Sequence, residues 1–248
     1  MRTILVTGAN RGIGLEFVRQ LARREPTPAF IFATCRSPDN AHDLQAVADT
    51  HTNVKVLKID MQNESTYGPV VEAVSSLVGE SGLNILINNA GVYSRDGYEK
   101  VSREMLKESF DINVIGPMRL TQAFLPLLKQ GARSSKLESF GVDRGAIINI
   151  SSGFGSIASN DSGGYAGYRE SKAALNMFTK GLSLDLKSEK ILVLSQCPGW
   201  VSTRMGGPHA SRTPESSVSD MLKIFAMYSE EHTGCYLRNH IPLEVLPY

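Results

Sequence analysis

The chain has 248 residues, of which 42% are hydrophobic, 21% charged and 7% aromatic, and its formal net charge is +1. This length can bury a sizeable core in one large α/β domain or two small ones. The near-neutral balance argues against a nucleic acid or an anionic membrane as a partner, because both require an excess of clustered basic charge.

Neither a membrane span nor a targeting segment is expected from the apolar runs. No run approaches the roughly 18–20 apolar residues that a spanning helix needs, and a strand-like run already begins at Thr3. The three cysteines, Cys35, Cys197 and Cys235, lie far apart and lack CxxC or Cys/His spacing. We therefore expect no metal site, no disulfide scaffold and a cytoplasmic location.

Short β-rich runs alternate with longer helical patterns along the whole chain. We predict strands at Thr3–Thr7, Phe30–Cys35, Val54–Ile59, Ile85–Asn88, Ala146–Ile150, Leu192–Gln196 and Cys235–Leu237. Helices are predicted between them, for example at Gly14–Arg23, Tyr67–Val78, Met105–Leu128 and Tyr165–Leu186. The strands are nearly all apolar, which is typical of a parallel sheet covered on both faces.

This alternation predicts one doubly wound, Rossmann-like α/β domain over residues 1–248, with a seven-stranded, mainly parallel sheet and helices on both faces. Two polar stretches interrupt it. Gln130–Gly145 is expected to form a surface loop to which we assign no role. Met205–Ser217 follows the sixth strand, at the sheet edge where open α/β folds bind ligands.

A glycine-rich loop joins the first strand to the first helix in "TILVTGANRGIGLEF". Gly8 permits a tight turn, Gly12 lets a pyrophosphate approach the backbone, and Gly14 permits close packing of helix on strand. The N-terminal dipole end and free N–H groups of the helix would then receive the phosphates. A purely structural turn is the alternative, but the strand–turn–helix context favours a dinucleotide site.

The end of the second strand indicates which nicotinamide cofactor fits. Arg36 stands where an acidic residue would bind a ribose 2′-hydroxyl, and Arg11 in the glycine loop adds a second positive charge. Guanidinium groups match phosphate geometry, so NADP(H) is favoured. In the alternative interpretation, Asp39 caps the next helix and Arg36 is merely solvated.

Two tyrosines occur in "GYAGYRESKAAL", but only Tyr168 has a lysine four residues later, Lys172. Residues with this spacing lie on one face of a helix, whereas Tyr165 is followed at the same spacing by Arg169. The helix comes after a strand that ends in "NISS". Hydroxyls and a Tyr/Lys face are therefore expected together at the carboxyl edge of the sheet.

Five motifs in this order, the glycine loop, "NNAG", "NISS", "YRESK" and "CPGWVST", resemble the short-chain dehydrogenase/reductase family over nearly the whole chain. The "CR" at the end of the second strand, the polar insertion before "AIIN" and the "PGWV" run resemble carbonyl reductases of the sniffer and C-factor type. The resemblance implies that residues 1–100 are mainly the cofactor-binding half and 101–248 the catalytic and substrate-binding half.

The resemblance also implies catalytic roles for four residues. Tyr168 would exchange the proton with the carbonyl oxygen, and Lys172 would hold the nicotinamide ribose and favour the tyrosinate by its charge. Ser152 would stabilise the substrate oxygen, and Asn113 would link the lysine to a water relay. The spacing between Ser152 and Tyr168 exceeds the family's usual one, so Ser151 is the alternative hydroxyl.

Cofactor and substrate contacts follow from the same resemblance. The implied cofactor-binding residues are Gly8, Asn10, Arg11, Gly12, Ile13, Gly14, Arg36, Asp60, Met61, Asn89, Ala90, Gly91, Tyr168, Lys172, Pro198, Gly199, Val201 and Thr203. Ser152, Tyr93, Phe154 and Trp200 are the expected substrate contacts, although each aromatic could equally serve packing. The tail "LRNHIPLEVLPY" lacks the Asp-Gly pair often found after the family's last strand.

The expected function is therefore NADPH-dependent reduction of an aldehyde, ketone or quinone, with a small-molecule carbonyl compound as the substrate. The alternative is a non-catalytic NADP(H)-binding signalling or sensor protein. Such a protein would be expected to lose one of the four catalytic residues, and all four are present. Family habit further implies a homodimer.

Overall fold

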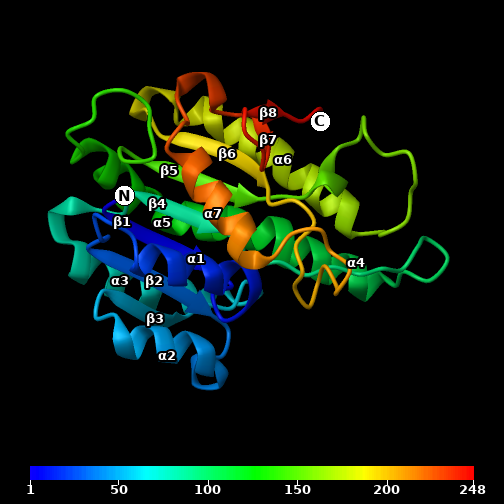
Figure 1. Cartoon of the computed structure of the whole chain (residues 1–248), viewed down its shortest axis with the longest axis horizontal. Coiled ribbons are helices and arrows are strands. Elements are labelled where there is room, and N and C mark those ends of the chain that lie inside the picture. The colour runs from blue at the N-terminus through cyan, green and yellow to red at the C-terminus, as the bar shows by residue number, and fades with distance from the viewer.

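A sheet of eight strands forms the centre of the computed structural model, which describes residues 1–248 (Figure 1). The strand order is β3-β2-β1-β4-β5-β6-β7-β8. The strands are β1 (Thr3–Thr7), β2 (Phe30–Cys35), β3 (Val54–Lys58), β4 (Ile85–Asn88), β5 (Ala146–Ile150), β6 (Leu192–Cys197), β7 (Tyr236–Arg238) and β8 (Glu244–Val245). The predicted Rossmann-like architecture is confirmed, with one strand more than expected.

The extra strand arises from the tail of the chain. The strands from β1 to β7 pair in parallel, whereas β8 folds back and pairs antiparallel with β7. Only two residues form β8, which reads "EV". A pairing this short carries no periodicity, so the sequence pattern could not reveal it.

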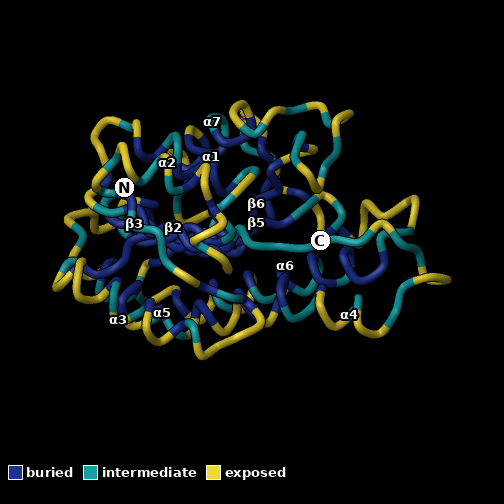
Figure 2. The backbone as a smooth tube through the Cα atoms, turned by 90° about the horizontal axis from the view of Figure 1, so that it is seen from below, coloured by how far each residue is buried: buried dark blue, intermediate teal, exposed yellow.

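Helices cover both faces of the sheet (Figure 2). α1 (Gly12–Ala22), α2 (His42–Thr50) and α7 (Pro214–Phe225) lie on one face, and α3 (Tyr67–Val78), α4 (Arg103–Phe110), α5 (Gly116–Arg133) and α6 (Tyr168–Asp185) lie on the other. Because side chains alternate along a strand, Ile4 and Val6 of β1 enter the core under α1 and α7, whereas Leu5 enters the core under α3 and α5. Both cores exclude water from the sheet that carries the site.

The helix expected over Met105–Leu128 is interrupted. It is replaced by α4, a π-helical segment at Asp111–Ile115, and α5. Periodicity did not reveal this, because the π-helical segment has only five residues, too few to show a period of their own. π-Helical turns within α-helices are frequent at functional sites, and this one contains the buried Asn113.

The strand order reverses between β1 and β4, which lie next to each other although two strands separate them in the chain. At such a switch point the loops after neighbouring strands diverge to opposite faces, and ligands bind in the crevice between them. The loops after β1 and β4 are therefore where a ligand site is expected. No helix in the structure combines the length and the apolar character needed to cross a membrane.

Candidate active site

Apart from Tyr168 and Lys172, which belong to α6, the predicted cofactor residues lie after the carboxyl ends of parallel strands. They follow β1 (Gly8, Asn10, Arg11, Gly12, Ile13, Gly14), β2 (Arg36), β3 (Asp60, Met61), β4 (Asn89, Ala90, Gly91) and β6 (Pro198, Gly199, Val201, Thr203). Parallel pairing brings these five loops to one edge of the sheet. Residues spread over most of the chain thus share one surface.

The glycine loop is packed too closely for larger residues. Gly8 has a φ of +64°, and a Cβ there would approach the Cα of Ala90 to 2.9 Å. A Cβ on Gly14 would come within 2.3 Å of the Gly8 carbonyl oxygen. Gly12 has a φ of +55° and faces the side chain of Thr203. The turn therefore leaves its backbone N–H groups accessible at the start of α1, the geometry that binds phosphate.

Thr7 joins the glycine loop to the loop after β4, a role that sequence reasoning missed. Its Oγ1 accepts hydrogen bonds from the N–H groups of Asn89 (2.9 Å) and Ala90 (3.0 Å). In return, Asn89 Nδ2 donates to the Thr7 carbonyl oxygen over 2.8 Å. A polar residue at the end of an otherwise apolar strand was the available signal, because a buried hydroxyl must find partners.

Arg36 and Arg11 are both exposed, after β2 and immediately before α1, respectively. Asp39 lies in a 3-10 turn and does not cap α2, whose N-cap residue is Ala41. Two guanidinium groups are therefore available on the side of the sheet where a 2′-phosphate would extend.

The residues after β3 make local contacts that shape a loop. Asp60 Oδ1 accepts from the N–H of Gln62 over 3.1 Å, and the Met61 carbonyl oxygen accepts from the hydroxyl of Tyr67 over 3.0 Å. These bonds fix the loop at the carboxyl end of the third strand, next to β2.

Tyr168 is the first residue of α6, and its side chain is buried. Burial raises the pKa of its hydroxyl to about 12, while a hydrogen bond with the Ser152 side chain opposes the rise. This direction is opposite to the lowering that we expected from the charge of Lys172, whose Nζ lies 5.8 Å from the ring centroid. Desolvation therefore decides the direction, and the tyrosine hydroxyl is protonated at neutral pH.

The two candidate serines have different partners. Ser151 Oγ donates to Oδ1 of Asn176 on α6 over 2.8 Å and is buried. Ser152 Oγ instead accepts from the N–H of Phe154 over 3.2 Å, and its side chain is near enough to Tyr168 to lower the pKa of the tyrosine hydroxyl. Only Ser152 therefore shares the site with the tyrosine hydroxyl.

Lys172 lies one turn after Tyr168 and is 4% exposed. Its Nζ donates to the Ile150 carbonyl oxygen over 2.8 Å. Burial lowers the pKa of the ammonium group to about 8, because the charged form loses hydration. The lysine is thus held at the carboxyl end of β5, close to Gly91 of the β4 loop.

Asn113 connects the β4 loop to α6. Its Oδ1 accepts from the Val92 N–H and its Nδ2 donates to the Val92 carbonyl oxygen, both over 2.9 Å. Nδ2 also donates to Ser171 Oγ over 3.0 Å. The side chain makes no direct hydrogen bond to Lys172. It instead holds Val92 of the β4 loop and Ser171, the neighbour of Lys172 on α6. The expected link between Asn113 and Lys172 therefore has to pass through another group.

Three aromatic rings, those of Tyr93, Phe154 and Tyr165, form a cluster next to Tyr168. Tyr93 lies 5.4 Å and Phe154 6.3 Å from Tyr168, both edge-on. Tyr165 packs on Phe154 at 4.5 Å and on Tyr93 at 5.9 Å between centroids. Tyr165 has a φ of +54°, a conformation that costs energy for a non-glycine residue and marks functional segments.

The structure thus places Tyr93 and Phe154, two of the expected substrate contacts, beside Tyr168, and packs Tyr165 against both of them. Trp200 is not part of this group: it is 56% exposed, and its Nε1 donates to the Gly206 carbonyl oxygen. No group of three or more His, Cys, Asp or Glu side chains is placed to hold a metal ion. The site thus combines an apolar aromatic wall with the hydroxyl of Tyr168 and the ammonium group of Lys172.

The sequence pattern of the family described as short chain dehydrogenase matches residues 2–213. An uncharacterized oxidoreductase of Schizosaccharomyces pombe is 32% identical over 93% of this chain and 92% of that protein. The protein named C-signal of Myxococcus xanthus is 37% identical over 66% of this chain and 93% of its own length.

Two solved structures superpose over the full chain. The carbonyl reductase Sniffer of D. melanogaster has a TM-score of 0.97 and 36% identity, with 100% of both chains covered. The NADPH-bound carbonyl reductase from chicken fatty liver has a TM-score of 0.94 and 37% identity, with 100% of this chain and 99% of that chain covered.

Proposed function

Because this chain belongs to the short-chain dehydrogenase family of oxidoreductases, we propose that it is an NADPH-dependent reductase of aldehyde, ketone or quinone carbonyls. One observation carries the proposal: the Ser152 side chain is near enough to the Tyr168 hydroxyl to oppose the rise of its pKa, beside the buried Lys172. The NADPH-bound state of the similar chicken carbonyl reductase supports the choice of cofactor.

The residues present fit this cofactor. The cradle formed by Gly8 and Gly14 admits no Cβ, so a phosphate can approach the backbone. Arg36 and Arg11 supply charge for a 2′-phosphate. Lys172 has three donors, of which the Ile150 carbonyl oxygen accepts one, so the others can serve ribose hydroxyls. Residues 1–100 then bind mainly the cofactor, and 101–248 complete the site.

The bound cofactor would supply the hydride, and the chain would supply position and a proton. In this mechanism the hydroxyl of Tyr168 protonates the carbonyl oxygen as hydride arrives at the carbon. Ser152 donates a hydrogen bond to the same oxygen and so stabilises the charge that develops on it. The raised pKa of Tyr168 keeps the proton on the tyrosine before the reaction, which favours reduction over oxidation.

Lys172 and Asn113 support the pair formed by Tyr168 and Ser152. The ammonium group of Lys172 holds the ribose, and its charge stabilises the tyrosinate that remains after proton transfer. Asn113 holds the backbone of Val92 and the side chain of Ser171, and thereby the distance between the β4 loop and α6. We propose that it also orders the water through which Tyr168 regains its proton.

The test is oxidation of NADPH by the purified protein in the presence of aldehydes or quinones, followed at the absorbance of the reduced cofactor. Tyr168→Phe should lower kcat by about 10²–10⁴-fold, the range expected for loss of a proton donor. Tyr165→Phe, which removes a hydroxyl from the same wall and keeps the ring, should retain most of the activity. Equal activity of wild type and Tyr168→Phe would disprove the mechanism.

The similarity to C-signal favours a second candidate, a non-catalytic NADP(H)-binding signalling protein. The two functions predict different results in the same experiment. A signalling protein would bind NADPH with no turnover on any carbonyl compound, and Tyr168→Phe would leave its binding unchanged.

We also propose that the protein forms a homodimer. Met177 and Leu184 on α6 are 72% and 63% exposed, and their spacing of two turns puts them on one face. Exposed apolar side chains that share a face are typical of association surfaces. Light scattering after size exclusion should give twice the chain mass, and Met177→Glu with Leu184→Glu should return it to the monomer value.

A further inference from the structure

The segment after β6 forms a loop whose two ends are joined. Val201 and Arg212 pair as a parallel β-bridge. The N–H of Ser202 donates to the Arg212 carbonyl oxygen over 2.8 Å, and the N–H of Arg212 donates to the Trp200 carbonyl oxygen over 3.1 Å. The residues between 202 and 212 are thereby closed into a loop that follows Pro198–Val201, the segment after β6.

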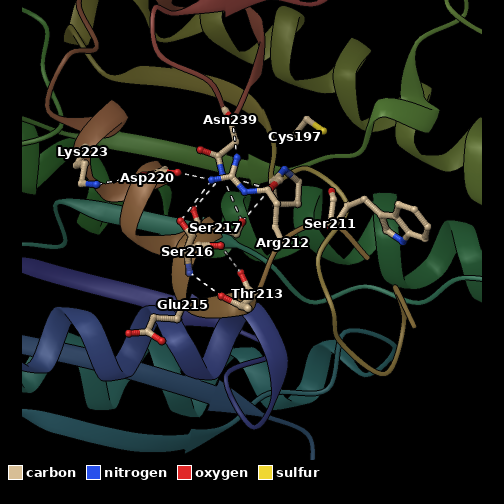
Figure 3. Close-up of polar contacts among 12 residues, drawn as sticks. Cys197, Ser211, Arg212, Thr213, Glu215, Ser216, Ser217, Asp220, Lys223 and Asn239 are labelled. Carbon is tan, nitrogen blue, oxygen red and sulfur yellow. Dashed lines mark hydrogen bonds and ion pairs between the residues drawn. The ribbon is translucent and has the colours of Figure 1, made fainter. Parts of the chain in front are cut away.

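The side chain of Arg212 connects this loop to two other elements (Figure 3). Nη1 donates to the Asn239 carbonyl oxygen after β7 over 3.0 Å. Nη2 donates to the carboxylate of Asp220 on α7 and, over 3.4 Å, to the Ser216 carbonyl oxygen. Lys223 also pairs with Asp220. Burial pushes the pKa of Asp220 upward, but Lys223 and Arg212 together lower it, so the carboxylate is charged at neutral pH.

Asn239 holds the start of the same segment. It is 4% exposed, and its Nδ2 donates to the carbonyl oxygens of Pro198 (3.2 Å) and Ser217 (2.9 Å). Ser217 Oγ donates to the Pro198 carbonyl oxygen as well, over 2.8 Å. Asn239 stands directly after β7, where this chain lacks the family's Asp-Gly pair. Its amide thus takes part in positioning the residues after β6.

These side chains contact the proposed cofactor site directly. A Cβ on Gly199 would lie 3.0 Å from Cδ of Arg212, so the arginine stem packs against the turn at Pro198–Gly199. Farther along the same segment, Thr203 faces Gly12 of the glycine loop, with 3.3 Å from its Cγ2 to the position of a Cβ there. A displacement of Arg212 would therefore move the backbone that borders the cofactor.

We propose that Arg212, Asp220 and Asn239 are positioning residues that hold Pro198–Thr203 against the bound cofactor. The proposal rests on the proposed function as an NADPH-dependent reductase. The side chains of Arg212 and Asp220 are 24% and 37% exposed. An ion pair at such a site contributes little to global stability. Its contacts with three separate elements instead restrict the position of the loop.

The variants Arg212→Gln and Asp220→Asn test this in the full chain. Each should raise the Kd and the KM for NADPH roughly tenfold, as for the loss of one charge-assisted hydrogen bond, and change kcat less than about twofold. Arg212→Lys keeps the charge but loses the guanidinium that reaches both Asn239 and Asp220. Its Kd for NADPH should therefore lie between the wild-type value and that of Arg212→Gln. Hydrogen exchange over residues 200–212 should accelerate in the same order.

Arg133→Gln is the matched control, because it removes an exposed ion pair with Glu189 (2.7 Å) at the end of α5. It should leave NADPH affinity and exchange over 200–212 at wild-type values. Unchanged exchange in Arg212→Gln, or faster exchange with unchanged NADPH affinity, would overturn the proposal. A wild-type protein that binds no NADPH would instead overturn the proposed function, while the exchange comparison would still decide whether Arg212 holds the loop.

Discussion

The hydroxyl of Ser151 donates to Oδ1 of Asn176 over 2.8 Å, so this serine serves the packing of β5 on α6. Its neighbour Ser152 instead lies near Tyr168, where it opposes the rise of the pKa of the tyrosine hydroxyl. We expect Ser152→Ala to lower kcat by about 10²–10³-fold, as for loss of one oxyanion donor. We expect Ser151→Ala to keep kcat but to lower the free energy of unfolding by about 1–3 kcal/mol, because Asn176 loses a buried partner.

Steady-state kinetics and urea unfolding of the two variants separate these roles. A loss of kcat in Ser151→Ala that exceeds the loss in Ser152→Ala would show that the alternative serine is the working one.

We predict that the buried ammonium group of Lys172 lowers the free energy of unfolding, although the proposed activity needs it. Its pKa falls from 10.5 in the unfolded chain to about 8 in the folded protein. Between these values the unfolded chain binds more protons, so this group makes the free energy of unfolding rise with pH from about 8 to 10.5. Lys172→Met should therefore be more stable than wild type by about 1–3 kcal/mol at pH 7, less so at pH 9.5, and inactive.

Urea unfolding of both proteins at pH 7 and pH 9.5 measures the difference. The same stability difference at both pH values would contradict the prediction, whatever the variant does to activity.

Arg36 should determine the preference for NADPH over NADH. Arg36→Asp replaces a phosphate-binding group with one that repels phosphate, so the ratio of kcat/KM for the two cofactors should fall by about 10–100-fold. Arg23→Asp makes the same change of charge at the exposed end of α1 and should leave the ratio unaltered. If wild type and Arg36→Asp had the same ratio of kcat/KM for NADPH and NADH, residues other than Arg36 would determine the cofactor preference.

Gly14 should not tolerate a methyl group. In Gly14→Ala the new Cβ would lie 2.3 Å from the Gly8 carbonyl oxygen, so the phosphate loop must shift at a cost of about 1–3 kcal/mol and NADPH affinity must fall. Gly181 on α6 has no heavy atom within 4 Å of the corresponding position. Gly181→Ala should therefore raise stability by about 0.5–1 kcal/mol and keep affinity. Thermal unfolding and cofactor titration of both variants check this.

Some expectations from the sequence met different outcomes for physical reasons. The strands and the alternation of the fold are confirmed, whereas β8 and the π-helical turn around Asn113 leave too short a pattern to be read. Trp200, one of the expected substrate contacts, lies apart from the aromatic rings around Tyr168, in an exposed turn where its Nε1 donates to the Gly206 carbonyl oxygen. An aromatic residue in a loop has no periodicity, so only packing decides where its ring lies.

The amino-acid sequence by itself determined the features that depend on short spacing. The glycines of the phosphate loop, and the pair Tyr168 and Lys172 on one face of a helix, follow from local geometry within one or two turns of chain. Tertiary structure alone decided which serine meets the tyrosine, that Tyr165 joins Phe154, and that Arg212 meets Asn239, 27 residues away. These contacts depend on how separate elements pack, and no local pattern encodes the partner of a side chain that far along the chain.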